Sequence, residues 1–130
     1  MNIRVKAGLV LLVLALTGCG SWVSHHGLKQ TGSVVAELKM VPNQPLVFHG
    51  DGKQRKEDDL IAYGWDQFLK HNDSNWLARL PMVKSAVRAM DALQAFAASK
   101  ECGSVKLDKF TVAGGSKRGW TTWCTAAVDP

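Results

Sequence analysis

The sequence lacks the marks of several common protein classes. Its four histidines and three cysteines show no spacing typical of a zinc site, since His25 and His26 are adjacent while His49 and His71 lie far apart. Its basic residues are dispersed among acidic ones and form no stripe with aromatic residues, which argues against nucleic-acid binding. We therefore expect no metal, no cofactor and no nucleic-acid partner.

The sequence also lacks an apolar run long enough to cross a membrane as a helix. Residues 8–16 form an apolar run that follows a positively charged start, and this run has the length of a signal-peptide core. Residues 16–19, Leu-Thr-Gly-Cys, resemble a bacterial lipobox, which implies cleavage before Cys19 and acylation of that cysteine. Gly20 in the next position resembles lipoproteins of the outer membrane that face the periplasm. An ordinary signal peptide with an incidental cysteine is the alternative.

These features divide the chain into a lipoprotein signal peptide at 1–18, a tether at 19–33 and a domain at 34–130. The tether shows little hydrophobic periodicity, as expected of a linker. Removal of the signal takes Arg4 and Lys6 from the 16 basic residues, so 14 remain against 11 acidic residues, a net charge of +3. We expect the mature protein to attach to the bacterial envelope through its acyl chains.

A strand, a sharp turn and a helix follow one another near the end of the chain. Residues 109–113 form a short, mostly apolar run that predicts a buried strand. Gly114 and Gly115 then allow a sharp turn, and Ser116 stands at the start of a helix predicted over 117–128. The inward face of that helix is predicted to carry Trp120, Trp123, Cys124 and Ala127.

Three interpretations compete for this turn. A phosphate-binding loop is disfavoured, because Trp120 stands in the position of the lysine that reaches the phosphates. A nucleophile turn of a hydrolase is the second, although the pattern is G-x-S-x-x-G, with its second glycine one place late. The third is a helix N-cap formed by Ser116. The turn alone does not decide between the last two.

The remaining pattern predicts alternating strands and helices. A strand with one wetter face begins near Val34, and the order strand, helix, helix, strand, helix is typical of a parallel sheet covered by helices. The first helix begins near Arg55 or Lys56, and its acidic start is attributed to the helix dipole and not to a metal site. The inward stripes are predicted as Ile61, Trp65, Phe68 and Leu69, and after Pro81 as Val83, Ala86, Val87, Met90, Leu93 and Ala97.

A longer pattern surrounds the turn. Residues 114–123 read Gly-Gly-Ser-Lys-Arg-Gly-Trp-Thr-Thr-Trp, and residues 125–129 read Thr-Ala-Ala-Val-Asp. Further matches in the same order are residues 41–46, Arg55, Glu57, Asp58, residues 63–65, Trp76, residues 80–82, Lys84 and residues 89–91. Over roughly residues 32–130 the chain resembles the PhoPQ-activated pathogenicity-related family of secreted or envelope proteins.

The resemblance implies an α/β fold: a partial, α/β-hydrolase-like parallel sheet with flanking helices, preceded by the lipoprotein signal peptide. It implies that Ser116 is the nucleophile of an ester or amide hydrolase linked to virulence or envelope stress resistance, with the Lys117 N–H in its oxyanion hole. The substrate would be a small molecule, an ester or a peptide. Arg118, with Lys117, either orients an acidic substrate group or is a solvated residue of the first helical turn.

Two points stay open at the level of sequence. The acid and the histidine of such a hydrolase are expected after Ser116, whereas all four histidines precede it. The chain therefore reads as an incomplete hydrolase, and a non-catalytic lipoprotein fragment or binding module is the alternative. Cys102 and Cys124 either form a disulfide or remain free thiols.

Overall fold

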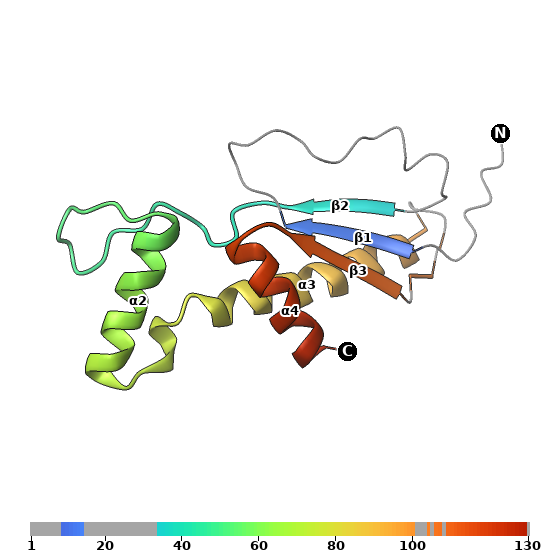
Figure 1. The fold of residues 1–130 in the computed structure, drawn as a ribbon. Helices are drawn as coiled ribbons and strands as arrows, with labels where there is room; N and C mark the ends of the chain where they lie inside the picture. Colours follow the sequence, from blue (N-terminus) through green and yellow to red (C-terminus); the bar gives the residue numbers. More distant parts are fainter. Residues whose placement is uncertain (1–8, 15–33, 101–103, 105, 108, 130) are drawn as a thin grey trace.

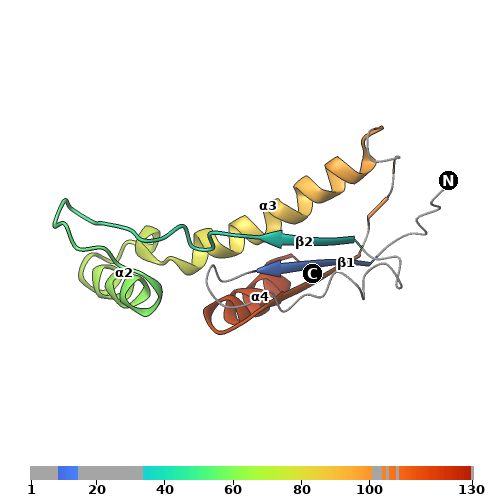
Figure 2. The same ribbon diagram turned by 90° about the horizontal axis from the view of Figure 1, so that it is seen from above.

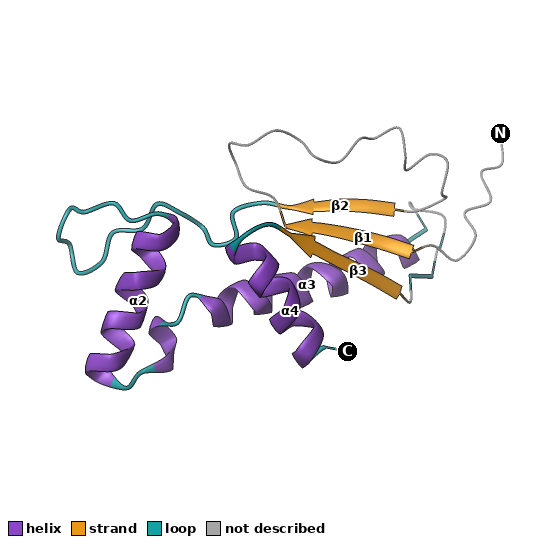
Figure 3. Ribbon diagram, in the orientation of Figure 1, coloured by secondary structure: helices purple, strands orange, loops and turns teal. Residues whose placement is uncertain are grey.

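The computed structural model describes residues 9–14, 34–100, 104, 106–107 and 109–129. The predicted lipidation site Cys19, the tether and Cys102 lie outside these residues. The elements, in chain order, are β1 (Leu9–Leu14), β2 (Val34–Leu38), α2 (Glu57–His71), the short 3-10 helix η1 (Ser74–Trp76), α3 (Arg79–Ala98), β3 (Lys109–Gly114) and α4 (Lys117–Val128), as Figures 1 and 3 show.

The fold class predicted from the sequence is wrong. Residues 34–130 are mostly helical, and their two short strands, β2 and β3, do not pair with each other. The described residues of this region therefore form no sheet of their own. The physical reason is that these residues contribute only two strands, of five and six residues, which lie too far apart to share hydrogen bonds.

The strand that lies between β2 and β3 comes from the predicted signal peptide. β1 pairs in parallel with β2, with Val10 opposite Val34 and Leu14 opposite Leu38. It also pairs in parallel with β3, with Leu14 opposite Gly114. An apolar run that reads as a signal-peptide core is thus also a strong strand former, because β-branched and aliphatic residues suit a covered strand.

Helix α3 runs along these strands, as the view from above shows (Figure 2). Helix α4 contacts both α3 and β3. The main apolar core forms between α3 and the strands around Ala86 and Met90. Residues of β2 and β3 pack against this pair from the strand side, namely Ala36, Leu38, Phe110 and Val112. The predicted inward residues Ala86, Met90 and Ala97 are indeed buried.

The predicted inward faces of α2 and α4 are wrong. In α2 the buried residues are Leu60, Gly64 and Gln67, while Trp65 and Leu69 are exposed. In α4 the buried residues are Arg118, Thr121 and Thr125, whereas Trp120 and Trp123 are 52% and 80% exposed. The buried face of each helix includes small or polar side chains, namely Gly64 and Gln67 in α2 and Arg118, Thr121 and Thr125 in α4, so hydrophobicity alone selects the wrong stripe.

Helix α2 lies to one side of the strands, beside a loop that crosses over its first turn (Figure 1). Backbone hydrogen bonds between Leu46 and Arg55 close this loop. The Arg55 guanidinium lies 3.9 Å from the ring centre of Tyr63, whose ring stacks on Phe48. A Cβ atom at Gly64 would approach the Trp76 carbonyl oxygen to 2.4 Å, so glycine is required where α2 meets η1.

Candidate active site at the Ser116 turn

Ser116 occupies the turn between β3 and α4 in a strained backbone conformation. Its φ is 51° and its ψ is −122°, a region that residues with a side chain rarely adopt. Such conformations cost about 1–3 kcal/mol and concentrate at functional sites. The residue is exposed at the end of the strand. The structure therefore places an exposed hydroxyl on a strained strand-to-helix turn.

The Ser116 side chain makes no capping hydrogen bond to helix α4. The interpretation as an N-cap serine is therefore wrong for the side chain, although Ser116 occupies the N-cap position. The free N–H groups of the next residues are partly satisfied by the turn itself, since the Arg118 N–H donates to the Gly115 oxygen at 2.9 Å. The Lys117 N–H has no acceptor among the described residues, as an oxyanion donor requires.

Two glycines allow the strand and the helix to approach closely at this turn. A Cβ atom at Gly119 would lie 2.9 Å from the Gly114 carbonyl oxygen, and one at Gly114 would lie 2.8 Å from the Arg118 carbonyl carbon. Gly115 has open space around it. The late second glycine of the G-x-S-x-x-G pattern thus has a packing role, because Gly119 faces the backbone of Gly114.

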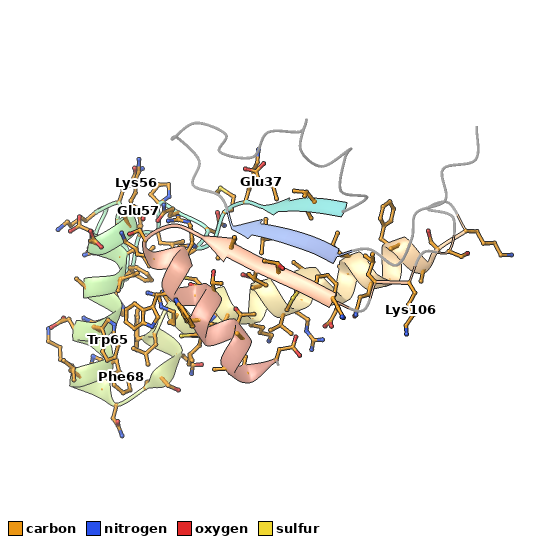
Figure 4. All side chains as sticks on the ribbon, turned by 45° about the vertical axis from the view of Figure 1, so that its right-hand side comes forward. Glu37, Lys56, Glu57, Trp65, Phe68 and Lys106 are labelled. Atoms are coloured by element: carbon orange, nitrogen blue, oxygen red, sulfur yellow. The ribbon has the colours of Figure 1, made fainter. Side chains whose placement is uncertain are left out.

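Two acidic residues at the start of α2 pair with the two basic residues that follow Ser116. The Arg118 guanidinium donates to both Glu57 carboxylate oxygens at 3.0 and 3.2 Å. The Lys117 ammonium lies 3.2 Å from a Glu57 oxygen and 2.9 Å from an Asp58 oxygen. Figure 4 shows Glu57 at the end of α2 nearest the start of α4. The acidic start of α2 therefore binds the first turn of α4.

These pairs change how the two basic residues are interpreted. The Arg118 side chain is 3% exposed and that of Lys117 is 14% exposed. Arg118 is therefore not the solvated residue that one interpretation predicted. Its guanidinium is occupied by Glu57, and this arrangement favours a structural role over direct contact with an acidic substrate. The role of Arg118 in orienting substrate stays a prediction.

A residue from the loop before α2 completes this network. The Gln44 side-chain amide donates to Glu57 at 2.5 Å, and its oxygen accepts the Glu57 backbone N–H at 2.9 Å. Hydrogen bonding from Arg118 lowers the pKa of Glu57 from its ordinary 4.5 to about 2. Hydrogen bonding to Asp58 raises the pKa of Lys117. Both shifts favour the charged forms of Glu57 and Lys117 at neutral pH.

Arg79, the first residue of α3, holds the first turn of α4 from another side. Its guanidinium donates to the Lys117 carbonyl oxygen at 2.5 Å and to the Thr121 hydroxyl at 2.8 Å. It also lies 4.1 Å from the centre of a Trp120 ring. Burial lowers the pKa of Arg79. The turn that carries Ser116 is thus fixed by side chains from both α2 and α3.

An apolar cavity of about 690 Å³ lies near this network but is not part of the Ser116 turn. The most buried of its lining residues are Val41, Leu60 and Met82, each 2% exposed or less. None of its lining residues belongs to the segment from Gly114 to Gly119. The residues that line the cavity therefore do not place a bound molecule next to Ser116.

The described residues supply no partner for the Ser116 hydroxyl. His49 packs against Trp76, with ring centres 5.3 Å apart, and His71 is the last residue of α2. Within the described ranges, no three histidine, cysteine or acidic side chains gather as a metal site would require. Cys124 is a free thiol. Of the helices described, none combines the length and hydrophobicity needed to cross a membrane.

Sequence reasoning missed the role of Glu57 and Asp58. It attributed these residues to the helix dipole, whereas they bind Lys117 and Arg118 about 60 positions away in the chain. The available signal was complementary charge: an acidic run opens one helix and a basic pair opens another. Their pairing depends on where α2 lies in space, which local sequence patterns do not specify.

Residues 23–130 match the sequence profile of the PhoPQ-activated pathogenicity-related protein family. The chain belongs to this family. The match confirms the resemblance recognised in the sequence, and it includes Ser116, its flanking glycines and the acidic residues of α2. It does not include β1, which lies before residue 23.

One curated relative of this PhoPQ-activated family chain is the autocrine proliferation repressor protein A of Dictyostelium discoideum, which is 52% identical over 101 residues. The aligned region is 77% of this chain and 20% of the relative. The chain thus spans about a fifth of that protein. No solved structure matches the chain.

Proposed function

We propose that this chain carries the nucleophile of a serine hydrolase that acts on an ester or amide, with Ser116 as the attacking residue. The observation that supports this most directly is the strained, exposed Ser116, whose hydroxyl is not used as a helix cap. A serine held in this way is presented outward at the positive end of a helix. The Lys117 N–H would stabilise the oxyanion formed when the hydroxyl attacks a carbonyl carbon.

The surrounding contacts support a preorganised turn. Ion pairs from Glu57 and Asp58 and hydrogen bonds from Arg79 hold the first turn of α4, which contains the Lys117 N–H. A donor that is fixed before the reaction stabilises developing charge without reorganisation. We assign Arg118 to this support, through Glu57, and not to substrate contact.

A fluorophosphonate probe tests the proposal, because it reacts with activated serines. The full-length gene product is labelled in wild-type and Ser116→Ala forms, and the label is mapped by mass spectrometry to the tryptic peptide of residues 110–117. We expect labelling of the wild type alone. A cooperative melt shows whether the wild-type protein is folded. Absence of label on folded wild-type protein would contradict the hydrolase function.

We also propose that Cys19 is acylated and attaches the protein to the outer membrane, where it faces the periplasm. The sequence pattern before Cys19 supports this proposal. Membership of the PhoPQ-activated pathogenicity-related family supports a role in virulence or envelope stress resistance, which we propose as well. Metabolic labelling with an alkyne fatty acid tests the acylation. Label and membrane association should both disappear in Cys19→Ser, and a soluble, unlabelled wild type would contradict the anchor.

A non-catalytic binding module is the second candidate. It is favoured by one observation, that no imidazole hydrogen-bonds the Ser116 hydroxyl among the described residues. A serine without a base is a weak nucleophile. The probe experiment separates the two functions, because a binding module would stay unlabelled even when folded.

A further inference from the structure

The strands β2 and β3 are held at a separation that leaves room for one strand between them. Each pairs in parallel with β1, which lies in the middle (Figure 1). Neighbouring strands lie about 4.8 Å apart, so the outer two are separated by about twice that distance. β2 and β3 therefore cannot hydrogen-bond each other unless one of them moves.

Helix α3 braces both outer strands. Ala86 and Met90 of this helix form the centre of the core cluster. Two residues of β2 and two of β3 pack on that cluster: Ala36 and Leu38, and Phe110 and Val112. Closing the gap would pull one strand away from these contacts. The spacing is thus set by a helix that belongs to the family region, and not by β1 alone.

The present occupant of the gap is the predicted signal peptide. β1 reads Leu-Val-Leu-Leu-Val-Leu and lies inside the apolar run 8–16. The family match begins at residue 23 and does not include it. Cleavage before Cys19 would remove β1 and leave the facing N–H and C=O groups of both outer strands without partners, which is costly for buried backbone.

We propose that the gap between β2 and β3 is a strand-binding site. In the uncleaved chain its own leader fills the site, and after cleavage an extended segment of a different protein fills it. The fitting partner is defined by the present occupant: about six aliphatic residues without proline, running parallel to both strands. Binding is by strand addition, here with a ladder of hydrogen bonds on each side. This inference rests on cleavage before Cys19 and is independent of any reaction at Ser116.

An exchange experiment on the full chain tests this site. A site-specific protease sequence is inserted between residues 18 and 19, and the folded protein is cut. A fluorescent peptide carrying residues 7–16 between solubilising lysines is then added. We expect the peptide to replace the released leader and to co-elute with the protein on gel filtration. The uncut chain should bind no peptide, because its site is already filled.

A matched peptide with Leu11→Pro and Leu12→Pro separates strand pairing from apolar adsorption. Consecutive N–H groups point to opposite neighbours, so these changes remove one donor from each ladder. We expect binding at least tenfold weaker. Equal binding of both peptides would overturn the proposal, as would a leader that never exchanges.

Two further outcomes would also overturn it. If the cut chain loses its leader, binds no peptide and keeps its melting temperature, then β2 and β3 have closed on each other. If cutting produces a dimer that excludes the peptide, the occupant is a second copy of this chain. Sedimentation of the cut protein, with and without peptide, distinguishes these results from the proposed exchange. Labelling of Ser116 by the fluorophosphonate probe is measured separately, so a failure of strand exchange does not bear on the proposed hydrolase function.

Discussion

The Glu57 carboxylate accepts two hydrogen bonds from the Arg118 guanidinium, although the residues are 61 positions apart in the chain. Arg118 is 2% exposed, while the Glu57 side chain is 34% exposed. A buried guanidinium is tolerated only when it is paired, so the position of α2 and the conformation of the Ser116 turn depend on each other. Glu57 is therefore the contact through which α2 supports the candidate active site.

Replacing Glu57 by an isosteric neutral residue should destabilise the protein. Glu57→Gln leaves the buried Arg118 charge uncompensated, and we expect a loss of about 2–3 kcal/mol in the free energy of unfolding. Asp58→Asn is the matched control, because the Asp58 side chain is 93% exposed and its pairing should contribute less than about 1 kcal/mol. Urea unfolding of the full chain measures both. Equal losses would show that burial of Arg118 does not matter.

Stability should fall in acid as Glu57 is protonated. Its pKa in the folded protein is about 2, below its ordinary 4.5, so the folded state favours the charged form. The stabilisation is fully present above pH 4.5 and is lost as the pH falls towards 2. Allowing for solvent at this partly exposed side chain, we expect a loss of about 1–2 kcal/mol. Urea titrations at several pH values between 5 and 2 measure this loss. The free energy of unfolding should decrease less with falling pH in Glu57→Gln than in the wild type.

The opposite dependence is expected at high pH for Lys117. Its pKa is raised in the folded protein by the hydrogen bond to Asp58 and then by Glu57. Its stabilisation is therefore present below its ordinary pKa of 10.5 and is lost as the pH rises through the higher, folded value. The free energy of unfolding of Lys117→Met, measured between pH 9 and 12, should lack this pH-dependent loss of stability. An unchanged pH profile in the variant would contradict the ion pair.

The glycines of the turn should differ in how they tolerate alanine. Gly119→Ala places a Cβ atom 2.9 Å from a backbone oxygen that cannot move aside, and we expect destabilisation of about 1–3 kcal/mol. Gly115→Ala is the control, since nothing lies within 4 Å of its added Cβ. We expect it to change stability by less than about 0.5 kcal/mol. Thermal melts followed by circular dichroism compare the two, and matching melting temperatures would refute the close packing.

Backbone strain at Ser116 should be released by glycine. Ser116→Gly and Ser116→Ala both remove the hydroxyl, but only glycine adopts a φ of 51° with a ψ of −122° at low cost. We expect Ser116→Gly to be more stable than Ser116→Ala by about 1 kcal/mol or more. Chemical unfolding of the two variants measures this difference. Equal stability would mean that the turn is relaxed in solution.

Local elements could be predicted because their signals are local. The strand at 109–113 and the helix at 117–128 follow from an apolar run, a glycine pair and a proline-free amphipathic segment, and both are observed within one residue. The burial of Ala86, Met90 and Ala97 also followed from periodicity. By contrast, the inward faces of α2 and α4 were predicted wrongly, since Trp65 and Trp123 are apolar but exposed.

The sequence by itself determined the family, the strand–serine–helix order around Ser116 and the approximate ends of the helices, because these depend on residues adjacent in the chain. Only the tertiary structure decided that Glu57 binds Arg118, that Gly119 meets the backbone of Gly114, and that β1 separates β2 from β3. These relationships join residues that are distant in sequence or depend on the path of the backbone. They are set by how charges and backbone atoms meet in space, which no local pattern of hydrophobicity encodes.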